Sequence, residues 1–340
     1  MIGGSIGLGL RGLGWHVTGR DLDPARAARA MELGALDAVG DDPAAEVTFV
    51  CTPVLSIPAV AAAALEAGGV VSDVGSVKKP VVAGVAHPCF VGGHPMAGSE
   101  QEGVDGADAT LFEGATWVLT PTVDTDAGAY TRVRSVITSL GADVIALPPD
   151  QHDEMVALVS HVPHLAAATL MTLAAEETVE HAAVLRLAAG GFRDMTRVAA
   201  GHPGIWPDIC AENREAIVGA LDRLVAALTT MRGVVDRGDR PGLLAALEGA
   251  RAARVNLPGR VVTAEGLAEL RVPVPDRLGV LAEVTTLLGE LDVNIVDLEI
   301  AHSVEGARGV LVVVVEEDDA GPAGSALAER GFRPSWRSLE

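Results

Sequence analysis

The sequence has few aromatic residues, cysteines and lysines. Phe, Trp and Tyr together make up 3% of the 340 residues, and arginine almost wholly replaces lysine, which occurs only at Lys78 and Lys79. The three cysteines, Cys51, Cys89 and Cys210, are too few and too scattered for a disulfide framework or a zinc site. This cysteine usage fits a reducing compartment, and we expect a cytoplasmic protein.

Long apolar runs and a basic surface are also missing. No stretch reaches the roughly 18 consecutive apolar residues that cross a bilayer, and the start lacks the charged, cleavable pattern of a signal peptide, so we expect no membrane partner. The formal net charge of −21 argues against nucleic acid, because proteins that bind it carry a basic footprint. Any anionic substrate would have to be held by a local group of arginines.

Up to residue 148, short β-rich runs alternate with Ala-rich helical segments. This alternation predicts an α/β, Rossmann-like domain over residues 1–148, with a parallel sheet covered on both faces. The predicted strands are 16–19, 47–51, 70–74, 89–91, 116–120 and 143–146.

Two other patterns follow this domain. Residues 149–258 contain long Ala, Leu and Val stretches at helical spacing, with Asp150 and Asp153 as the expected N-cap. These features predict an all-helical domain that packs against the same domain of a second copy in a homodimer. Leu257-Pro258-Gly259 breaks the helix. Residues 266–340 then follow the order βαββαβ, which is typical of a ferredoxin-like fold.

The start of the chain has features of a dinucleotide-binding fold. Gly3-Gly4-Ser5 is typical of its first helix, and Asp21 follows the predicted strand 16–19 and Arg20, at the place where an acid binds the adenosine ribose. Asp21 favours NAD over NADP, although Arg20 beside it leaves NADP open. The literal G-x-G-x-x-G at residues 7–12 is rejected because no strand precedes it. We interpret Gly3 as the last glycine of a fingerprint whose first strand lies upstream of Met1, so the N-terminus looks truncated.

His94 lies in the most informative segment, Val91 to Glu100. It follows a predicted strand and two glycines, Gly92 and Gly93, that would let a ligand approach the backbone closely. An imidazole in such a frame suits the removal of a proton, because its ordinary pKa lies near physiological pH. A polar loop upstream contains Ser76 and Lys78, and the latter is either a solvated charge or a neighbour of a phosphate.

In this order, the motifs resemble those of the prephenate dehydrogenase family of tyrosine biosynthesis, which includes arogenate and cyclohexadienyl dehydrogenases. The resemblance covers the whole chain, and its last part is similar to an ACT domain, a small regulatory fold that binds amino acids. The motifs are Gly3-Gly4-Ser5, Asp21, Cys51-Thr52-Pro53, Asp73 to Lys78, Gly92 to Gly98, Ser160 to His164, Gly190 to Arg197, Trp206 to Ile209, Asn213, and Pro275 to Leu281.

The resemblance implies an NAD-dependent oxidoreductase that acts on a CH–CH donor. Prephenate would become 4-hydroxyphenylpyruvate as a hydride leaves for NAD, the hydroxyl loses its proton and CO₂ departs. His94 would accept that proton, with Ser76 beside it. The implied substrate-binding residues are Arg197, which would hold a carboxylate, Arg193, His164, Glu100 and Trp206. The implied cofactor-binding residues are Gly3, Gly4, Ser5, Asp21, Thr52, Pro53 and Ser76.

The C-terminal segment is expected to regulate the activity. By the resemblance to ACT domains, an amino-acid effector, expected to be tyrosine, would bind at Asp276, Gly279 and Asn294 and exert feedback. Gly279 is equally well explained as an ordinary helix-start glycine.

Other functions stay open at this point. Arogenate dehydrogenase differs only in a substrate that carries an amine where prephenate carries a keto group. A β-hydroxyacid or imine reductase on this scaffold would need a catalytic lysine in the helical domain, and none follows Lys79. A non-catalytic amino-acid sensor is the remaining alternative. His152, Glu154, His161 and His164 could together be metal ligands, but we expect no metal.

Overall fold

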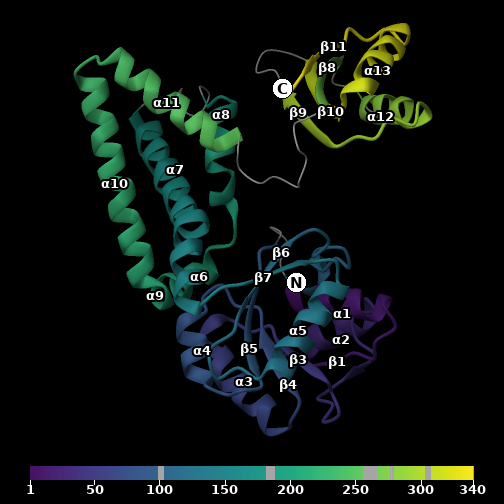
Figure 1. The fold of residues 1–340 in the computed structure, drawn as a ribbon, viewed down its shortest axis with the longest axis vertical. Helices are drawn as coiled ribbons and strands as arrows, with labels where there is room; N and C mark the ends of the chain where they lie inside the picture. The colour runs from purple at the N-terminus through teal and green to yellow at the C-terminus, as the bar shows by residue number, and fades with distance from the viewer. Residues whose placement is uncertain are drawn as a thin grey trace. The chain divides into compact units, whose positions relative to one another are not determined.

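The structure is a computed structural model that describes residues 1–98, 103–180, 188–255, 266–275, 277, 279–302 and 308–339. Its contacts divide the chain into two compact units (Figure 1). The first comprises Met1–Arg186 and Met195–Leu243, and the second comprises Leu187–Asp194 and Leu244–Glu340. Each unit is described by itself below.

A five-stranded sheet forms the centre of the first unit. Its order is β3-β4-β5-β6-β7, with β3 Val47–Val50, β4 Val70–Asp73, β5 Phe90–Pro95, β6 Thr116–Thr120 and β7 Asp143–Ala146. Strands β3, β4 and β5 are parallel, and β6 is antiparallel to β5 but parallel to β7. The prediction of a wholly parallel sheet was therefore wrong. A parallel connection needs a long crossover, usually a helix, and the residues described between β5 and β6 contain only the 3₁₀ turn η2, Val104–Gly106.

Two short strands pair separately from this sheet. β1, Thr18–Gly19, and β2, Ala38–Val39, form a parallel two-stranded sheet with α2, Pro24–Glu32, between them in sequence. Among the described strands, β3 pairs only with β4.

Helices cover both faces of the central sheet. Because side chains alternate along a strand, Val70 packs with α1, Ile2–Gly12, and α5, Ala127–Ser139, whereas Val71 packs with α3, Ile57–Glu66, and α4, Lys79–Val85. The literal G-x-G-x-x-G at residues 7–12 lies inside helix α1, which confirms that it is not a phosphate-binding turn.

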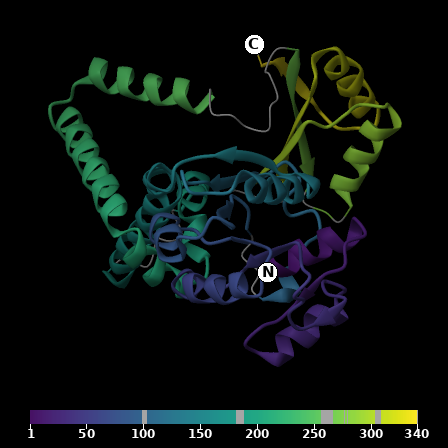
Figure 2. The same ribbon diagram turned by 60° about the horizontal axis from the view of Figure 1, so that its bottom comes forward.

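The helical part of the first unit follows the sheet (Figure 2). It contains α6 Pro149–Val156, the π-helical turn η3 Ala157–His161, α7 Val162–Glu180, η5 Arg197–Ala200, η6 Pro203–Ile205, α9 Trp206–Glu212 and α10 Arg214–Asp236. Helix α8, Gly190–Thr196, spans the division between the units. By length and composition the helical stretch Pro149–Glu176 could cross a membrane, contrary to the sequence expectation. It also carries buried His152, Asp153 and His161, as expected of a helix that packs within a protein.

The second unit contains α11, Arg240–Val255, from Leu244 onward, and a four-stranded sheet with two helices. The sheet order is β11-β8-β10-β9, all antiparallel, and the elements are β8 Leu267–Pro275, α12 Val280–Glu290, β9 Asp297–His302, β10 Arg308–Glu316, α13 Glu317–Glu329 and β11 Ser335–Ser338. This βαββαβ arrangement confirms the ferredoxin-like prediction. Helix α13 begins at Glu317, and the acidic residues of its first turn suit a helix N-terminus.

Candidate active site

The end of strand β5 carries His94. The sequence predicted that the strand ends at Val91 and that His94 follows it in a loop, but β5 runs through Pro95. The extension forms because His94 pairs with Val118 and Pro95 with Trp117 across the antiparallel contact with β6. A strand holds the imidazole more rigidly than a loop would.

The two glycines before His94 serve packing inside the sheet. A Cβ on Gly93 would lie 2.6 Å from the carbonyl oxygen of Asp73, and one on Gly92 would lie 2.4 Å from the Thr120 hydroxyl. Both spaces are filled by the protein's own atoms. The expectation that these glycines leave room for a ligand was therefore wrong, and they let β5 pass close to β4 and β6 instead.

A buried ion pair lies against Gly93. Lys78 and Asp73 have no exposed side-chain surface, and the Lys78 Nζ contacts both the Asp73 carboxylate and, at 2.8 Å, the Gly93 carbonyl oxygen. The Asp73 carboxylate also accepts hydrogen bonds from the backbone N–H groups of Gly75, at 2.8 Å, and Gly93, at 3.1 Å. Lys78 is thus neither a solvated loop charge nor free to bind a phosphate, and it ties the loop after β4 to β5.

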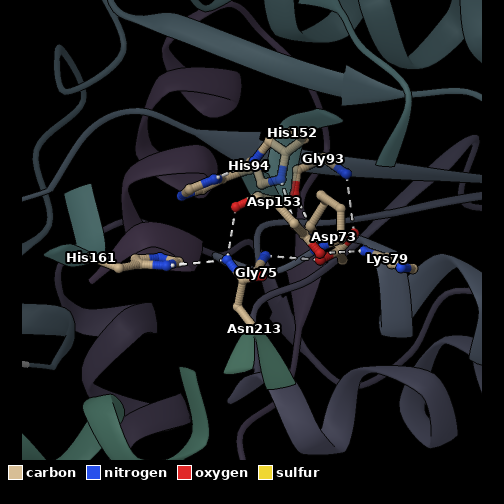
Figure 3. Close-up of polar contacts among 10 residues, drawn as sticks. Asp73, Gly75, Lys79, Gly93, His94, His152, Asp153, His161 and Asn213 are labelled. Carbon is tan, nitrogen blue, oxygen red and sulfur yellow. Dashed lines mark hydrogen bonds and ion pairs between the residues drawn. The ribbon is translucent and has the colours of Figure 1, made fainter. Parts of the chain in front are cut away.

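A chain of three side chains extends from His94 into helix α6 (Figure 3). The His94 Nδ1 lies 2.9 Å from the His152 Nε2, and the His152 Nδ1 lies 2.8 Å from the Asp153 Oδ1. The two imidazole rings meet edge to face, with centroids 5.1 Å apart. His94 is half-buried, whereas His152 and Asp153 are buried.

Asp153 joins helix α6 to the loop after β4. Its carboxylate accepts hydrogen bonds of 2.8 Å from the backbone N–H groups of Lys78 and Lys79, and its carbonyl oxygen accepts one of 2.9 Å from the Asn213 side chain. Asn213 also lies 3.3 Å from the His161 Nδ1. The expected N-cap role of Asp153 was wrong, because the helix begins at Pro149 and the carboxylate faces backbone donors of another segment.

The surroundings of His94 keep its imidazole neutral. Burial, together with His152, Lys78 and His161, holds the pKa of His94 well below its ordinary value of 6.5. Burial likewise lowers the pKa of His161 to about 4. A neutral imidazole with one available ring nitrogen is a hydrogen-bond acceptor and a base.

The first turn of α7 and the start of α9 meet beside this chain. His164 stacks on Trp206 with ring centroids 3.8 Å apart, and His161 meets the edge of the same indole at 6.0 Å. Arg197 is exposed at the start of η5, a turn that packs along α7. The structure therefore brings His164 and Trp206 together as the resemblance implied, whereas contact of either residue or of Arg197 with a substrate stays a prediction.

The predicted cofactor-binding residues lie at the start of α1 and at strand ends. Ser5 is fully buried, and its hydroxyl lies 3.2 Å from the Met1 carbonyl oxygen and 3.0 Å from the Asp108 backbone nitrogen, so this hydroxyl is used inside the protein. Asp21 is exposed just after β1. Arg20 pairs with Asp41 at 2.9 Å.

The other predicted cofactor-binding residues lie just after strands β3 and β4 or at the start of α1. Thr52 and Pro53 follow β3, and Ser76 is half-buried three residues after β4. The Thr52 hydroxyl oxygen is buried without a hydrogen-bond partner among the residues that the structure describes. Gly3 and Gly4 lie in the first turn of α1, where a Cβ would meet Cys51 and Ala107 respectively. The carboxyl ends of parallel strands are where such folds bind a dinucleotide, so these positions suit one.

Several predicted residues are not placed relative to His94. Glu100 and Asp276 lie outside the described residues. Arg193, Gly279 and Asn294 belong to the second unit, where all three are exposed. Gly279 has φ +83° at the N-cap of α12, a backbone conformation that itself favours glycine. Among the described residues, no group of three or more His, Cys, Asp or Glu side chains is arranged to hold a metal ion.

Sequence reasoning missed His152, Asp153 and Asp73 as members of the site. His152 was considered only as a metal ligand and Asp153 only as a helix cap. The pair lies 58 residues from His94 in sequence, and only the packing of α6 against the sheet brings it there.

Comparison with known proteins agrees with this architecture. Residues 6–146 match the family described as "Prephenate dehydrogenase, nucleotide-binding domain", residues 148–249 match "Prephenate dehydrogenase, dimerization domain", and residues 268–331 match "ACT domain". The prephenate dehydrogenase of Bacillus subtilis is 32% identical over 94% of this chain and 91% of its own length.

Two solved structures are also similar. The prephenate dehydrogenase of Aquifex aeolicus, in complex with hydroxyphenyl propionate and NAD+, is 29% identical with a TM-score of 0.71, over 76% of this chain and 95% of that one. The arogenate dehydrogenase of Synechocystis is 30% identical with a TM-score of 0.66, over 74% of this chain and 95% of that one. The predicted order of a Rossmann-like nucleotide-binding domain, a helical domain and an ACT domain is confirmed, and the chain belongs to the prephenate dehydrogenase family of oxidoreductases.

Proposed function

We propose that this protein is an NAD-dependent prephenate dehydrogenase that carries out the oxidative decarboxylation of prephenate to 4-hydroxyphenylpyruvate. The observation that carries the proposal is a neutral, half-buried imidazole, His94, at the carboxyl edge of a nucleotide-binding sheet. The family membership and the NAD+ that the Aquifex aeolicus relative binds support the cofactor.

The chemistry asked of His94 is limited. It accepts the proton of the substrate's ring hydroxyl as the adjacent carbon gives up its hydride and the carboxylate leaves as CO₂. When bound, NAD+ supplies the hydride acceptor. Aromatisation of the ring provides most of the driving force, so the protein's main tasks are alignment and proton removal. Ser76, on the loop after β4, is proposed to adjust the same hydrogen bond.

The cofactor is proposed to lie across the ends of β1, β3 and β4. The exposed Asp21 carboxylate suits the two ribose hydroxyls and would repel the 2′-phosphate of NADP. The pairing of Arg20 with Asp41 leaves that guanidinium less available for such a phosphate. The unpartnered Thr52 hydroxyl and Pro53 would border the nicotinamide, and Gly3, Gly4 and the backbone at Ser5 would lie along the phosphates.

The substrate is proposed to bind between His94 and the stacked pair of His164 and Trp206. Arg197 would hold a carboxylate, since a guanidinium pairs with it through two parallel hydrogen bonds. Arg193 and Glu100 are proposed as further contacts of the same site. The edge-to-face contact of His161 with Trp206 supports a fixed indole on this side.

A direct assay tests this function. The purified protein is incubated with prephenate or arogenate and with NAD+ or NADP+, and formation of the reduced cofactor is followed at its near-ultraviolet absorbance. We expect turnover with prephenate and NAD+, with 4-hydroxyphenylpyruvate as the product. Preference for arogenate would instead support the alternative that this protein is an arogenate dehydrogenase, as the Synechocystis relative is described. Absence of turnover with all four combinations of substrate and cofactor would contradict the proposal.

A homodimer formed through the helical domain, in the cytoplasm, is part of the proposal. Helix α10 exposes Val218, Val225, Leu228 and Val235, which recur at helical spacing along one side. Such a stripe suits burial against a second copy, and the matched family segment is described as a dimerization domain. We also propose domain boundaries at 1–148, 149–258 and 266–340; the proposed linker around Pro258 lies outside the described residues.

Feedback by tyrosine through the ACT domain is the expected regulation. Binding of tyrosine at Asp276, Gly279 and Asn294 would stabilise the folded domain by mass action. We expect saturating tyrosine to lower the rate and to raise the unfolding temperature of the C-terminal unit, with alanine as the control amino acid. If tyrosine, phenylalanine and tryptophan all leave both quantities unchanged, this part of the proposal fails.

A further inference from the structure

Helix α6 places His152 against the proposed base and Asp153 against His152, in an order that fixes where the protons of His94 and His152 lie. Asp153 is a carboxylate that already accepts two backbone hydrogen bonds, from Lys78 and Lys79. A carboxylate accepts and does not donate, so the 2.8 Å contact with the His152 Nδ1 requires a proton on that nitrogen. In neutral His152 the other nitrogen, Nε2, is then an acceptor.

The position of the His152 proton in turn determines which nitrogen of His94 is protonated. Its Nδ1 lies 2.9 Å from the acceptor nitrogen of His152, so the His94 Nδ1 must carry the proton. The His94 Nε2 is then unprotonated. No hydrogen bond joins that nitrogen to another residue within the described part of the chain, and it is the atom available to a substrate hydroxyl.

We infer that His152 and Asp153 are positioning residues that hold His94 in its Nδ1–H tautomer and accept charge from it during turnover. The inference rests on the proposed function of His94 as the base. In the step itself, the substrate O–H bond breaks and an Nε2–H bond forms on His94. The His94 Nδ1–H bond then breaks as an Nε2–H bond forms on His152. The charge that results on His152 lies next to the Asp153 carboxylate, and His94 is again neutral.

The supports around the pair suit this role. Asp153 is held from three sides, by the N–H groups of Lys78 and Lys79 and, through its own carbonyl, by Asn213. The π-helical turn η3 follows directly after α6 and ends at His161, next to Asn213. The groups that face His94 electrostatically are His152 on α6, Lys78 on the loop after β4 and His161 on η3. Of these, only His152 contacts an imidazole nitrogen of His94.

Nitrogen NMR tests the tautomers without any turnover. In ¹⁵N-labelled protein, one-bond and long-range proton couplings distinguish an N–H nitrogen from a bare one, and His94→Asn and His152→Gln variants assign the two rings. We expect His94 and His152 both to be Nδ1–H in the free wild-type protein. In Asp153→Asn we expect His152 to lose that preference. An Nε2–H tautomer of His94 in the wild type would overturn the inference.

Kinetics of Asp153→Asn test the charge transfer. We expect kcat to fall by about 10- to 100-fold with the KM for substrate unchanged, less than the roughly 10⁴-fold loss when a carboxylate directly adjoining a catalytic histidine becomes an amide. Because removal of a negative charge disfavours a protonated partner, the acidic limb of kcat/KM should also move to lower pH. A merely structural role would lower activity without moving that limb.

Two further variants complete the design. Asp150→Asn makes the same change at an exposed position in the first turn of the same helix, and we expect the wild-type rate. His152→Gln keeps the test decisive if Asp153→Asn does not fold, and we expect it too to lower kcat with KM unchanged. Full activity in either His152→Gln or Asp153→Asn would overturn the inference. An inactive wild type with both histidines as Nδ1–H would refute the proposed function alone.

Discussion

Replacement of His94 by asparagine is expected to lower kcat by about 10²- to 10⁴-fold, the usual contribution of a general base. The amide is too weak a base to take the hydroxyl proton, while the substrate and cofactor contacts proposed at Arg197, Thr52 and Asp21 are untouched. KM and the affinity for NAD+ should therefore stay near the wild-type values. Steady-state kinetics with prephenate and a separate NAD+ titration by calorimetry measure the two effects independently.

His87→Asn is the matched control. His87 is exposed just before β5, and its imidazole makes one hydrogen bond with the described residues, in which the Nδ1 accepts from the Cys89 N–H. The same substitution there should leave turnover unchanged. If His94→Asn retains the wild-type kcat while both proteins unfold at the same temperature, His94 is not the base.

The pH dependence of the wild type follows from the same environment. In the proposed reaction neutral His94 is the active form, and burial holds its pKa well below 6.5. As the pH falls through 6.5, the imidazole therefore stays neutral and kcat/KM is retained. We expect the acidic limb only below that value, whereas a limb above pH 6.5 would contradict the burial of this group.

Apart from β2, which was missed, the strands of the nucleotide-binding domain could be predicted from the sequence to within a few residues, because each is a short β-rich run. β6 and β7 begin and end where they were expected. The direction of β6 could not be predicted, since it depends on the connection from β5 and not on the composition of the strand. The end of β5 was missed for a related reason, because its last residues are held by pairing with β6.

The sequence suggests a candidate role where a residue has a distinctive local setting. His94 is set apart by glycines and a proline, and Asp21 by its place at a strand end. Asp153 and Lys78 have no such setting, because a carboxylate in a helix or a lysine after a strand is most often solvated. Their roles come from contacts 75 and 15 residues away in sequence, with Lys78 and Gly93 respectively, which no local pattern encodes.

Loss of the Lys78 ammonium is expected to destabilise the nucleotide-binding domain strongly. Lys78→Met leaves the Asp73 carboxylate with no exposed surface and no counter-ion, although the Gly75 and Gly93 N–H groups still reach it. Removal of one partner of a buried ion pair typically costs about 3–5 kcal/mol. Urea unfolding followed by tryptophan fluorescence measures the change, since Trp117 lies in the core of this domain.

Lys79→Met provides an unusually close control, because it changes the neighbouring lysine in the same way. Lys79 is exposed, its backbone N–H donates to Asp153, and its ammonium forms no ion pair with the residues that the structure describes. We expect its free energy of unfolding to stay within about 0.5 kcal/mol of the wild type.

The double variant Asp73→Asn/Lys78→Met separates lost charge pairing from lost packing. It buries no uncompensated charge, and the amide oxygen introduced at position 73 can still accept from one of the two backbone N–H groups. It should therefore be less destabilised than Lys78→Met alone, with a coupling of about 0.5–3 kcal/mol between the two positions. If the losses in the free energy of unfolding from the two single substitutions simply add, the Lys78 side chain stabilises the domain by packing next to Gly93, and its charge contributes little.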